Sequence, residues 1–165
     1  VMAVGYEGSP SRGYQVSALL QSIAQFLDGE EAVGVALVGV GNLGRALLAY
    51  FVERHPRLSI RAAFDRDPAK SNRVIHGCRC LPVEELGEVV AAEKIRLGII
   101  TVPAEDAQRV ATVLCQAGVM GILNFAPVRV WTPPTVYVEQ IDVTTALEKV
   151  AFFARRSGAG KEVTI

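Results

Sequence analysis

The chain has 165 residues, of which 50% are hydrophobic and 21% charged, and its 17 basic side chains balance its 17 acidic ones. This size and composition are typical of one soluble globular domain that buries a core without disulfides or metal. A net charge of zero argues against a nucleic-acid-binding domain, which normally has a strongly basic face, and excludes the polybasic segment of a membrane anchor.

The chain has three cysteines, Cys78, Cys80 and Cys115. An odd, sparse set is not a disulfide framework, and Cys-x-Cys lacks the second ligand pair of a zinc site, so we expect buried free thiols and no metal. Residues Val1–Pro10 show no basic region followed by an apolar stretch, and no run of about 18 apolar residues occurs. We therefore predict neither a secretory signal nor a membrane span, and a cytoplasmic location.

The first part of the chain is predicted to contain a linker and one helix. Residues 1–14 are rich in Gly, Ser and Pro, which is typical of a linker. Apolar residues then recur at helical spacing and predict a helix that ends near Gly29. The residues of this apolar stripe are Val16, Leu19, Leu20, Ile23 and Leu27.

From Gly34 onward, predicted strands alternate with predicted helices. The expected strands are Val35–Val40, Ser59–Phe64, Leu97–Val102, Val119–Phe125 and Thr135–Glu139. The expected helices between them are Leu43–Arg54, Pro82–Lys94 and Pro103–Ala117. The stretch Asp67–Cys80 is ambiguous between a short helix and a short strand. This alternation predicts an α/β fold with a doubly wound, mostly parallel sheet and an extra N-terminal helix.

One more helix is predicted over Thr145–Arg156. We interpret Thr145-x-x-Glu148 as its capping box, and Arg155 and Arg156 lie where a helix C-terminus favours cations. The adjacent Phe152 and Phe153 point about 100° apart on a helix of 3.6 residues per turn. Such a wide apolar arc needs more than one surface to pack on, which favours a partner subunit over packing on the chain's own sheet.

A glycine-rich sequence follows the strand Val35–Val40 and begins the next helix. Its six residues are candidate cofactor-binding residues: Gly39, Val40, Gly41, Asn42, Leu43 and Gly44. The G-x-G-x-x-G spacing alone is weak evidence, but a strand before it and a helix after it are typical of a dinucleotide-binding motif. Gly39 permits the tight turn, Gly41 lets the backbone approach a pyrophosphate, and Gly44 lets the helix pack closely on the strand. A tight turn without a ligand is the alternative.

Asp65 ends the second strand of this unit, 21 residues after Gly44. This is the separation expected for the acid that hydrogen-bonds an adenosine ribose, and its carboxylate would repel a 2′-phosphate. The residue therefore predicts NAD(H) rather than NADP(H). Arg66 follows at once and offers a cation to such a phosphate, which leaves the preference open. A turn-forming Asp65 is the alternative.

Two later strands end in residues that we also expect to contact the cofactor, because ligands of open α/β sheets bind outside the carboxyl ends of strands. These candidates are Thr101, Val102, Pro103, Asn124, Phe125, Ala126 and Pro127. Plain loop chemistry is the alternative for both segments.

No catalytic residue is predicted. A dehydrogenase needs a proton donor or acceptor near the nicotinamide. The two histidines, His55 and His76, are each expected at the surface, and no tyrosine is followed four positions later by lysine. The site is expected to hold a dinucleotide without reacting with it.

Taken together, these segments resemble the Rex family of redox-sensing transcriptional repressors over roughly Gly5 to Arg156. The segments that carry the resemblance are Gly13–Val16, Ala36–Leu47, Phe64–Pro68, Thr101–Pro103, Gly121–Pro127 and Ile141–Thr144. The combination is specific, although the glycine motif by itself is not.

The resemblance implies a Rossmann-like, homodimeric sensor whose subunits each bind NADH or NAD⁺ and exchange their C-terminal helices. It implies that the oxidised cofactor allows operator binding and that NADH releases the DNA. Tyr50 and Asp142 match a tyrosine and an aspartate near the nicotinamide that exchange hydrogen-bond partners between states, with Asp142 acting across the dimer. From the residues alone, Asp142 is equally a cap of the last helix.

The family's N-terminal winged-helix domain has no counterpart here, so operator DNA is expected to be bound through a domain that is not present in this chain. The predicted organisation is a linker remnant (1–14), an NAD(H)-binding domain with its leading helix (15–143), a dimerisation helix (144–156) and a tail (157–165). Two alternatives remain: a CoA-binding domain like that of a succinyl-CoA synthetase, and a small NAD-dependent reductase.

Overall fold

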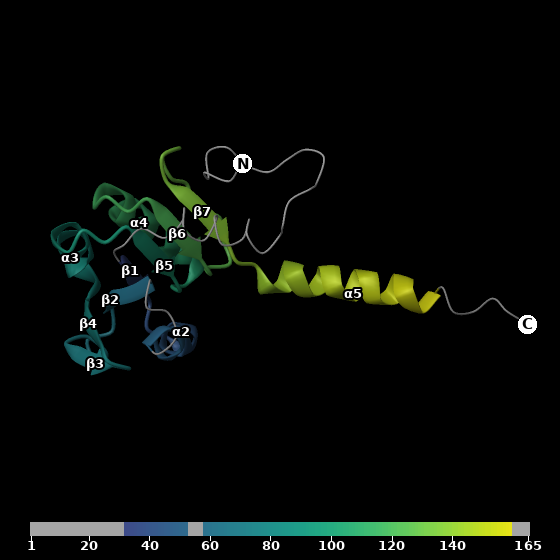
Figure 1. The fold of residues 1–165 in the computed structure, drawn as a ribbon, viewed down its shortest axis with the longest axis horizontal. Helices are drawn as coiled ribbons and strands as arrows, with labels where there is room; N and C mark the ends of the chain where they lie inside the picture. The colour runs from purple at the N-terminus through teal and green to yellow at the C-terminus, as the bar shows by residue number, and fades with distance from the viewer. Residues whose placement is uncertain (1–31, 53–57, 160–165) are drawn as a thin grey trace, which may run out of the picture. The chain divides into compact units, whose positions relative to one another are not determined.

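The computed structural model describes residues 32–52 and 58–159 (Figure 1). The described strands form one sheet in the order β3-β4-β2-β1-β5-β6-β7, in which every neighbouring pair is parallel except β3 with β4. The strands are β1 (Val33–Val38), β2 (Leu58–Asp65), β3 (Arg73–Ile75), β4 (Cys78–Pro82), β5 (Leu97–Ile100), β6 (Gly121–Asn124) and β7 (Tyr137–Gln140). The helices are α2 (Asn42–Val52), α3 (Leu86–Ala92), α4 (Ala104–Gln116) and α5 (Val143–Ala159), with a short 3₁₀ helix, η2 (Val83–Glu85).

The predicted doubly wound α/β fold with a mostly parallel sheet is confirmed. The ambiguous stretch Asp67–Cys80 contains β3, the turn after it and the start of β4. The helix expected over Pro82–Lys94 is shorter than predicted, because its first turn is the 3₁₀ helix η2 and α3 ends at Ala92. The predicted linker and the predicted helix before Gly29 lie outside the described residues.

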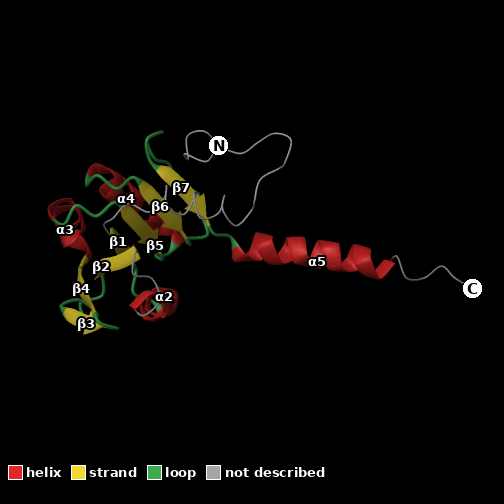
Figure 2. Cartoon of the chain, viewed as in Figure 1, coloured by secondary structure: helices red, strands yellow, loops and turns green. Residues whose placement is uncertain are grey.

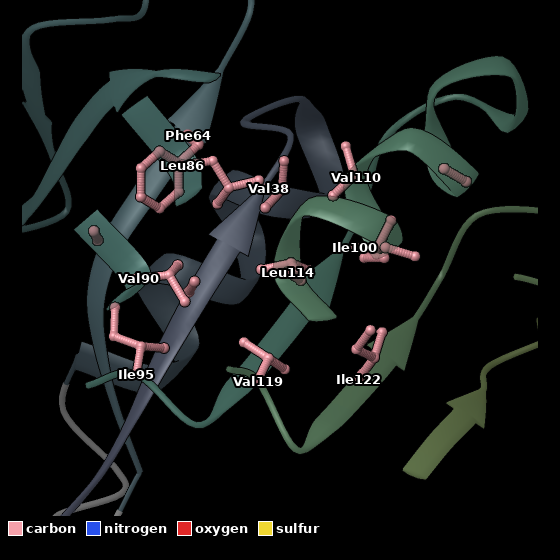
Figure 3. Packing of buried hydrophobic residues seen from close by; sticks show 14 of the residues in the cluster. Val38, Phe64, Leu86, Val90, Ile95, Ile100, Val110, Leu114, Val119 and Ile122 are labelled. Carbon is pink, nitrogen blue, oxygen red and sulfur yellow. The ribbon is translucent and has the colours of Figure 1, made fainter. Parts of the chain in front are cut away.

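Two separate hydrophobic clusters cover the two faces of the sheet, because successive residues of a strand point to opposite faces. On one face, Val38 and Phe64 pack with Leu86 of α3 and with Val110 and Leu114 of α4 (Figure 3). On the other face, Leu37, Ala63 and Ile99 pack with Leu48 of α2. Figure 2 shows the strands between these helices. Every strand of the sheet's centre is thus buried on both sides, as its continuous apolar sequence predicts.

The predicted burial of the cysteines holds for two of the three. Cys78 and Cys80 lie in the second cluster, on β4, whereas Cys115 is only partly buried. Burial raises the pKa of the Cys78 thiol from 9.0 to about 11. These thiols therefore behave as small apolar side chains at neutral pH.

The order of the strands places a crevice at the carboxyl end of β1. The chain runs from β1 to β2 on one side and later returns to β5 on the other side of β1. The helices that follow β1 and β5 lie on opposite faces of the sheet. A change of direction of this kind is where open α/β sheets bind their ligands.

Helix α5 begins two residues earlier than predicted, and the predicted capping box is wrong. Asp142 caps the helix: its carboxylate accepts bonds from the Thr145 backbone N–H (3.0 Å) and the Thr145 hydroxyl (2.7 Å). These two bonds hold the pKa of Asp142 below its ordinary value. Thr145 is therefore the third residue of the helix, and its side chain supports the cap instead of being one.

The described side chains of α5 are exposed from Val143 to Arg155. Among them, large apolar side chains recur at helical spacing with exposed fractions between 55% and 69%: Val143, Leu147, Val150, Phe152 and Phe153. No helix among the described residues has the length and apolar character needed to cross a membrane.

Candidate functional site

The glycine loop after β1 is held against the ends of β2 and β5. The Gly39 N–H donates to the Phe64 carbonyl (2.8 Å), and the Thr101 hydroxyl donates to the Gly39 carbonyl (2.7 Å). Gly39 has a φ of +100°, which side chains rarely adopt, and a Cβ there would lie 2.7 Å from the Thr101 carbonyl oxygen. A Cβ on Gly44 would lie 2.0 Å from the Gly39 carbonyl oxygen. Both glycines are therefore required by the packing of the loop.

Gly41 differs from these two glycines, because a Cβ built on it meets no atom within 4 Å. It lies at the start of α2, where its carbonyl accepts the first helical bond, from the Arg45 N–H (3.0 Å). Nothing in the described fold requires glycine at this position. The open space beside Gly41 suits a ligand that approaches the backbone at a helix N-terminus.

Asp65 is buried at the end of β2 and contacts the glycine loop directly. One carboxylate oxygen accepts bonds from the Val40 N–H (2.6 Å) and the Lys70 ammonium (3.3 Å). The other oxygen accepts the Asp67 N–H (2.8 Å). A carboxylate offers about four acceptor positions, so one remains for a hydroxyl of a bound ligand.

A first cavity of about 360 Å³ opens beside Gly41 and Asp65, at the carboxyl ends of β1, β2 and β5. Its lining includes Gly39, Gly41, Asp65, Arg66, Thr101, Val102 and Pro103, all predicted site residues. Val38, Lys70, Val83, Asp106, Arg109 and Val110 complete it. The lining thus combines apolar side chains with three cations and two carboxylates, of which Asp65 is buried deepest.

A second cavity of about 650 Å³ lies at the carboxyl ends of β6 and β7. The predicted residues Leu43, Phe125, Pro127 and Asp142 line it. Further lining residues are Val128, Arg129, Gln140, Ile141, Val143, Thr144 and Thr145. Because Gly41 lines the first cavity and Leu43 the second, the two cavities flank the N-terminus of α2.

Asn124 is fully buried, and its amide is bonded within the protein. The Asn124 Nδ2 donates to the Val128 carbonyl (2.8 Å) and to Oε1 of Gln140 (2.8 Å), while its Oδ1 accepts the Ala126 N–H (3.0 Å). Gln140 in turn donates to the Ala126 carbonyl (2.8 Å). These bonds fix the loop after β6, so Asn124 shapes the wall of the second cavity from behind.

The predicted residues are not all brought to a cavity wall. Six lie outside both linings: Val40, Asn42, Gly44, Tyr50, Asn124 and Ala126. Tyr50 lies on the later part of α2, with its ring against that of Phe51 at a centroid distance of 5.5 Å. Tyr50 therefore does not line the second cavity, to which Asp142 belongs.

Three charged residues of the first cavity, Lys70, Asp106 and Arg109, are not among the residues that the sequence predicts for the site. Asp106 and Arg109 are spaced i, i+3 on the helix that follows Thr101-Val102-Pro103, so they share one helix face. The i, i+3 spacing alone predicts that the two side chains share a helix face. Whether that face meets the cavity depends on how α4 packs on the sheet.

Comparison with known proteins gives a family match over most of the chain. Residues 30–128 match the family model described as CoA binding domain. The chain is also similar to a redox-sensing transcriptional repressor Rex of Leuconostoc citreum, at 38% identity over 94% of this chain and 72% of that protein.

Two similar solved structures are crystal structures of RSP, a Rex-family repressor. The complex of RSP with beta-NADH has a TM-score of 0.79 and 26% identity, covering 92% of this chain and 74% of that one. The complex with beta-NAD⁺ and operator DNA has a TM-score of 0.79 and 26% identity, covering 94% and 71%.

Proposed function

The chain belongs to the Rex family of redox-sensing transcriptional repressors, its residues 30–128 match the CoA binding domain family, and we propose that it binds NADH and NAD⁺ across its two cavities. The observation that carries the proposal is Asp65, buried at the end of β2 with its carboxylate on the glycine loop and facing the first cavity. The adenosine would occupy that cavity, the pyrophosphate would lie over Gly41, and the nicotinamide would enter the second cavity.

The two cofactors differ only at the nicotinamide ring. The ring is positively charged in NAD⁺, and in NADH an added hydride makes it neutral. Discrimination must therefore arise in the second cavity, which Phe125 lines, and at the Asp142 that a partner subunit would bring to it. The fixed loop behind Phe125, held by Asn124 and Gln140, supports this by giving the cavity a defined wall. NADH can shift the protein toward a state that releases operator DNA only by binding that state better.

We further propose that the sensor is a homodimer joined through α5. The exposed apolar side chains of α5 support this, because a partner helix or sheet would bury them. In that arrangement the partner's Asp142 would lie beside the nicotinamide pocket and exchange hydrogen-bond partners with Tyr50. The winged-helix domain of the family would read the operator, and a repressor of this kind acts in the cytoplasm.

No catalytic role is proposed. Neither cavity brings a histidine to its lining, and the one described histidine, His76, is exposed on a turn with a φ of 46°. The cofactor would act here as a ligand whose redox state is measured, not as a reactant.

Coenzyme A is the second candidate ligand, because the family model over residues 30–128 is described as CoA binding domain. Its adenosine ribose carries a phosphate, which would lie near the buried Asp65 carboxylate in the first cavity. That repulsion favours NAD(H) over coenzyme A.

Calorimetric titration of the chain with NADH, NAD⁺, NADPH and coenzyme A tests the proposal. We expect both NADH and NAD⁺ to bind more tightly than NADPH or coenzyme A, with NADH about tenfold or more tighter than NAD⁺. Tightest binding of coenzyme A or NADPH would overturn the role of Asp65. Equal affinities for NADH and NAD⁺ would overturn the sensor.

A further inference from the structure

One carboxylate in the first cavity binds two arginines from different elements. Asp106 of α4 accepts a bond from Arg66, which follows β2, at 2.9 Å, and another from Arg109 of α4 at 3.1 Å. Each arginine uses a different oxygen of the carboxylate. The Asp106 side chain is 16% exposed, whereas the two arginine side chains are 64% and 60% exposed.

Asp106 has a defined position at the third residue of α4, where its own N–H donates to the Pro103 carbonyl (3.1 Å). A carboxylate is favoured in the first turn of a helix, so the backbone holds the acid in place and the flexible arginines adapt to it. Ion pairs with such exposed partners contribute little to folding stability. The main effect of these ion pairs is therefore on the position of the two guanidinium groups, and not on folding stability.

The other charges that face this cavity are Asp65 and Lys70, and Lys70 is also engaged. Its ammonium contacts Asp65 at 3.3 Å and Asp67 at 3.8 Å. All three cations of the cavity lining are thus paired with carboxylates in the described structure. An anionic group added to the bound adenosine would therefore compete with these carboxylates for the cations.

We infer that Asp106 is a specificity-determining residue, which pairs with Arg66 and Arg109 in the cavity lining, competes with a ribose 2′-phosphate for their guanidinium groups and so makes the cavity prefer NAD(H) to NADP(H). The inference rests on the proposed binding of a nicotinamide dinucleotide. A ribose 2′-phosphate carries close to two negative charges at neutral pH and is best bound by a free guanidinium. Asp65 repels that phosphate directly, and Asp106 removes the nearest arginine that would compensate.

The test measures the affinities of the full chain for NADH and NADPH before and after Asp106→Asn. The amide keeps the size of the side chain but lacks the charge that binds the guanidinium groups. We expect the affinity for NADPH to rise about tenfold or more. A gain of this size corresponds to one added charge-assisted hydrogen bond. NADH affinity should change by less than about threefold.

Two further variants separate the role of Asp106 from a general change of charge. Glu105→Gln removes the same charge from the same turn of α4, but Glu105 is exposed and does not line the cavity, so the NADH to NADPH ratio should stay unchanged. In Arg66→Gln/Asp106→Asn the gain in NADPH affinity should shrink, because the freed arginine is gone.

Each contrary result has a distinct meaning. Equal loss of NADH and NADPH binding in Asp106→Asn would show a purely structural role and overturn the inference, as would an equal NADPH gain in Glu105→Gln. An unchanged ratio in Asp106→Asn, with NADH still bound, would overturn the inference alone. Failure of the unmodified chain to bind NADH would instead overturn the proposed function.

Discussion

At the scale of single residues, the three glycines of the loop after β1 serve different purposes. Gly39 and Gly44 are enclosed by backbone, while the Cβ position of Gly41 is open. Their common spacing in the sequence does not distinguish them, and only the surrounding atoms do. The enclosure of Gly39 and Gly44 agrees with the tight turn and the close helix packing that the strand–turn–helix context predicts, and the pyrophosphate contact of Gly41 stays a prediction.

We predict that Gly41→Ala leaves the fold intact and weakens NADH binding about tenfold or more, since the new methyl group would occupy the path of the pyrophosphate. Gly44→Ala should instead lower the free energy of unfolding by about 3 kcal/mol, because the methyl group meets the Gly39 carbonyl oxygen. Thermal unfolding and fluorescence titration with NADH check both. A Gly41→Ala protein with normal NADH affinity would contradict the assignment of the pyrophosphate.

At the scale of elements, the start of α5 shows how an element boundary depends on one side chain. Thr145-x-x-Glu148 has the pattern of a capping box, yet Asp142 takes the cap and the helix begins at Val143. Both patterns compete for the same few free N–H groups, and the Asp142 carboxylate wins with two bonds to Thr145.

We predict that Asp142→Ala reduces the helical circular dichroism signal of the chain, whereas Asp142→Asn, which keeps a capping acceptor, retains most of it. The folded-state pKa of Asp142 is lowered, so its contribution is present above the ordinary value of 3.8 and is lost as the pH falls through the lowered pKa. An acid titration of the helical signal measures this. Equal losses in the two variants would contradict the cap and point to a role for the charge itself.

At the scale of the whole molecule, the described fold leaves the large apolar side chains of α5 exposed. Val143, Leu147 and Val150 follow one another at i, i+4 and i+7, so they share one face of the helix. The sequence predicted a second packing surface from the same residues, and dimerisation through it is part of the proposed function.

We predict that Val150→Asp weakens self-association about tenfold or more, because the substitution places a charge in the buried interface of both subunits. The neighbouring Lys149→Asp, on another face of the helix, should leave self-association nearly unchanged. Sedimentation velocity over a range of concentrations measures both. A dimer that survives Val150→Asp would show that this face of α5 is not the interface.

The sequence by itself determined the parallel sheet, the glycine loop and the acid at the end of β2, because each depends on patterns within about 30 residues: continuous apolar strands, glycine spacing and the distance from Gly44 to Asp65. Only the tertiary structure decided which charges meet in the first cavity. Arg66 and Asp106 lie 40 positions apart and come together because β2 and β5 flank β1. The same applies to Asn124, whose amide is satisfied by Gln140 on the neighbouring strand. Contacts of this kind follow from strand order and helix rotation, and no local pattern specifies them.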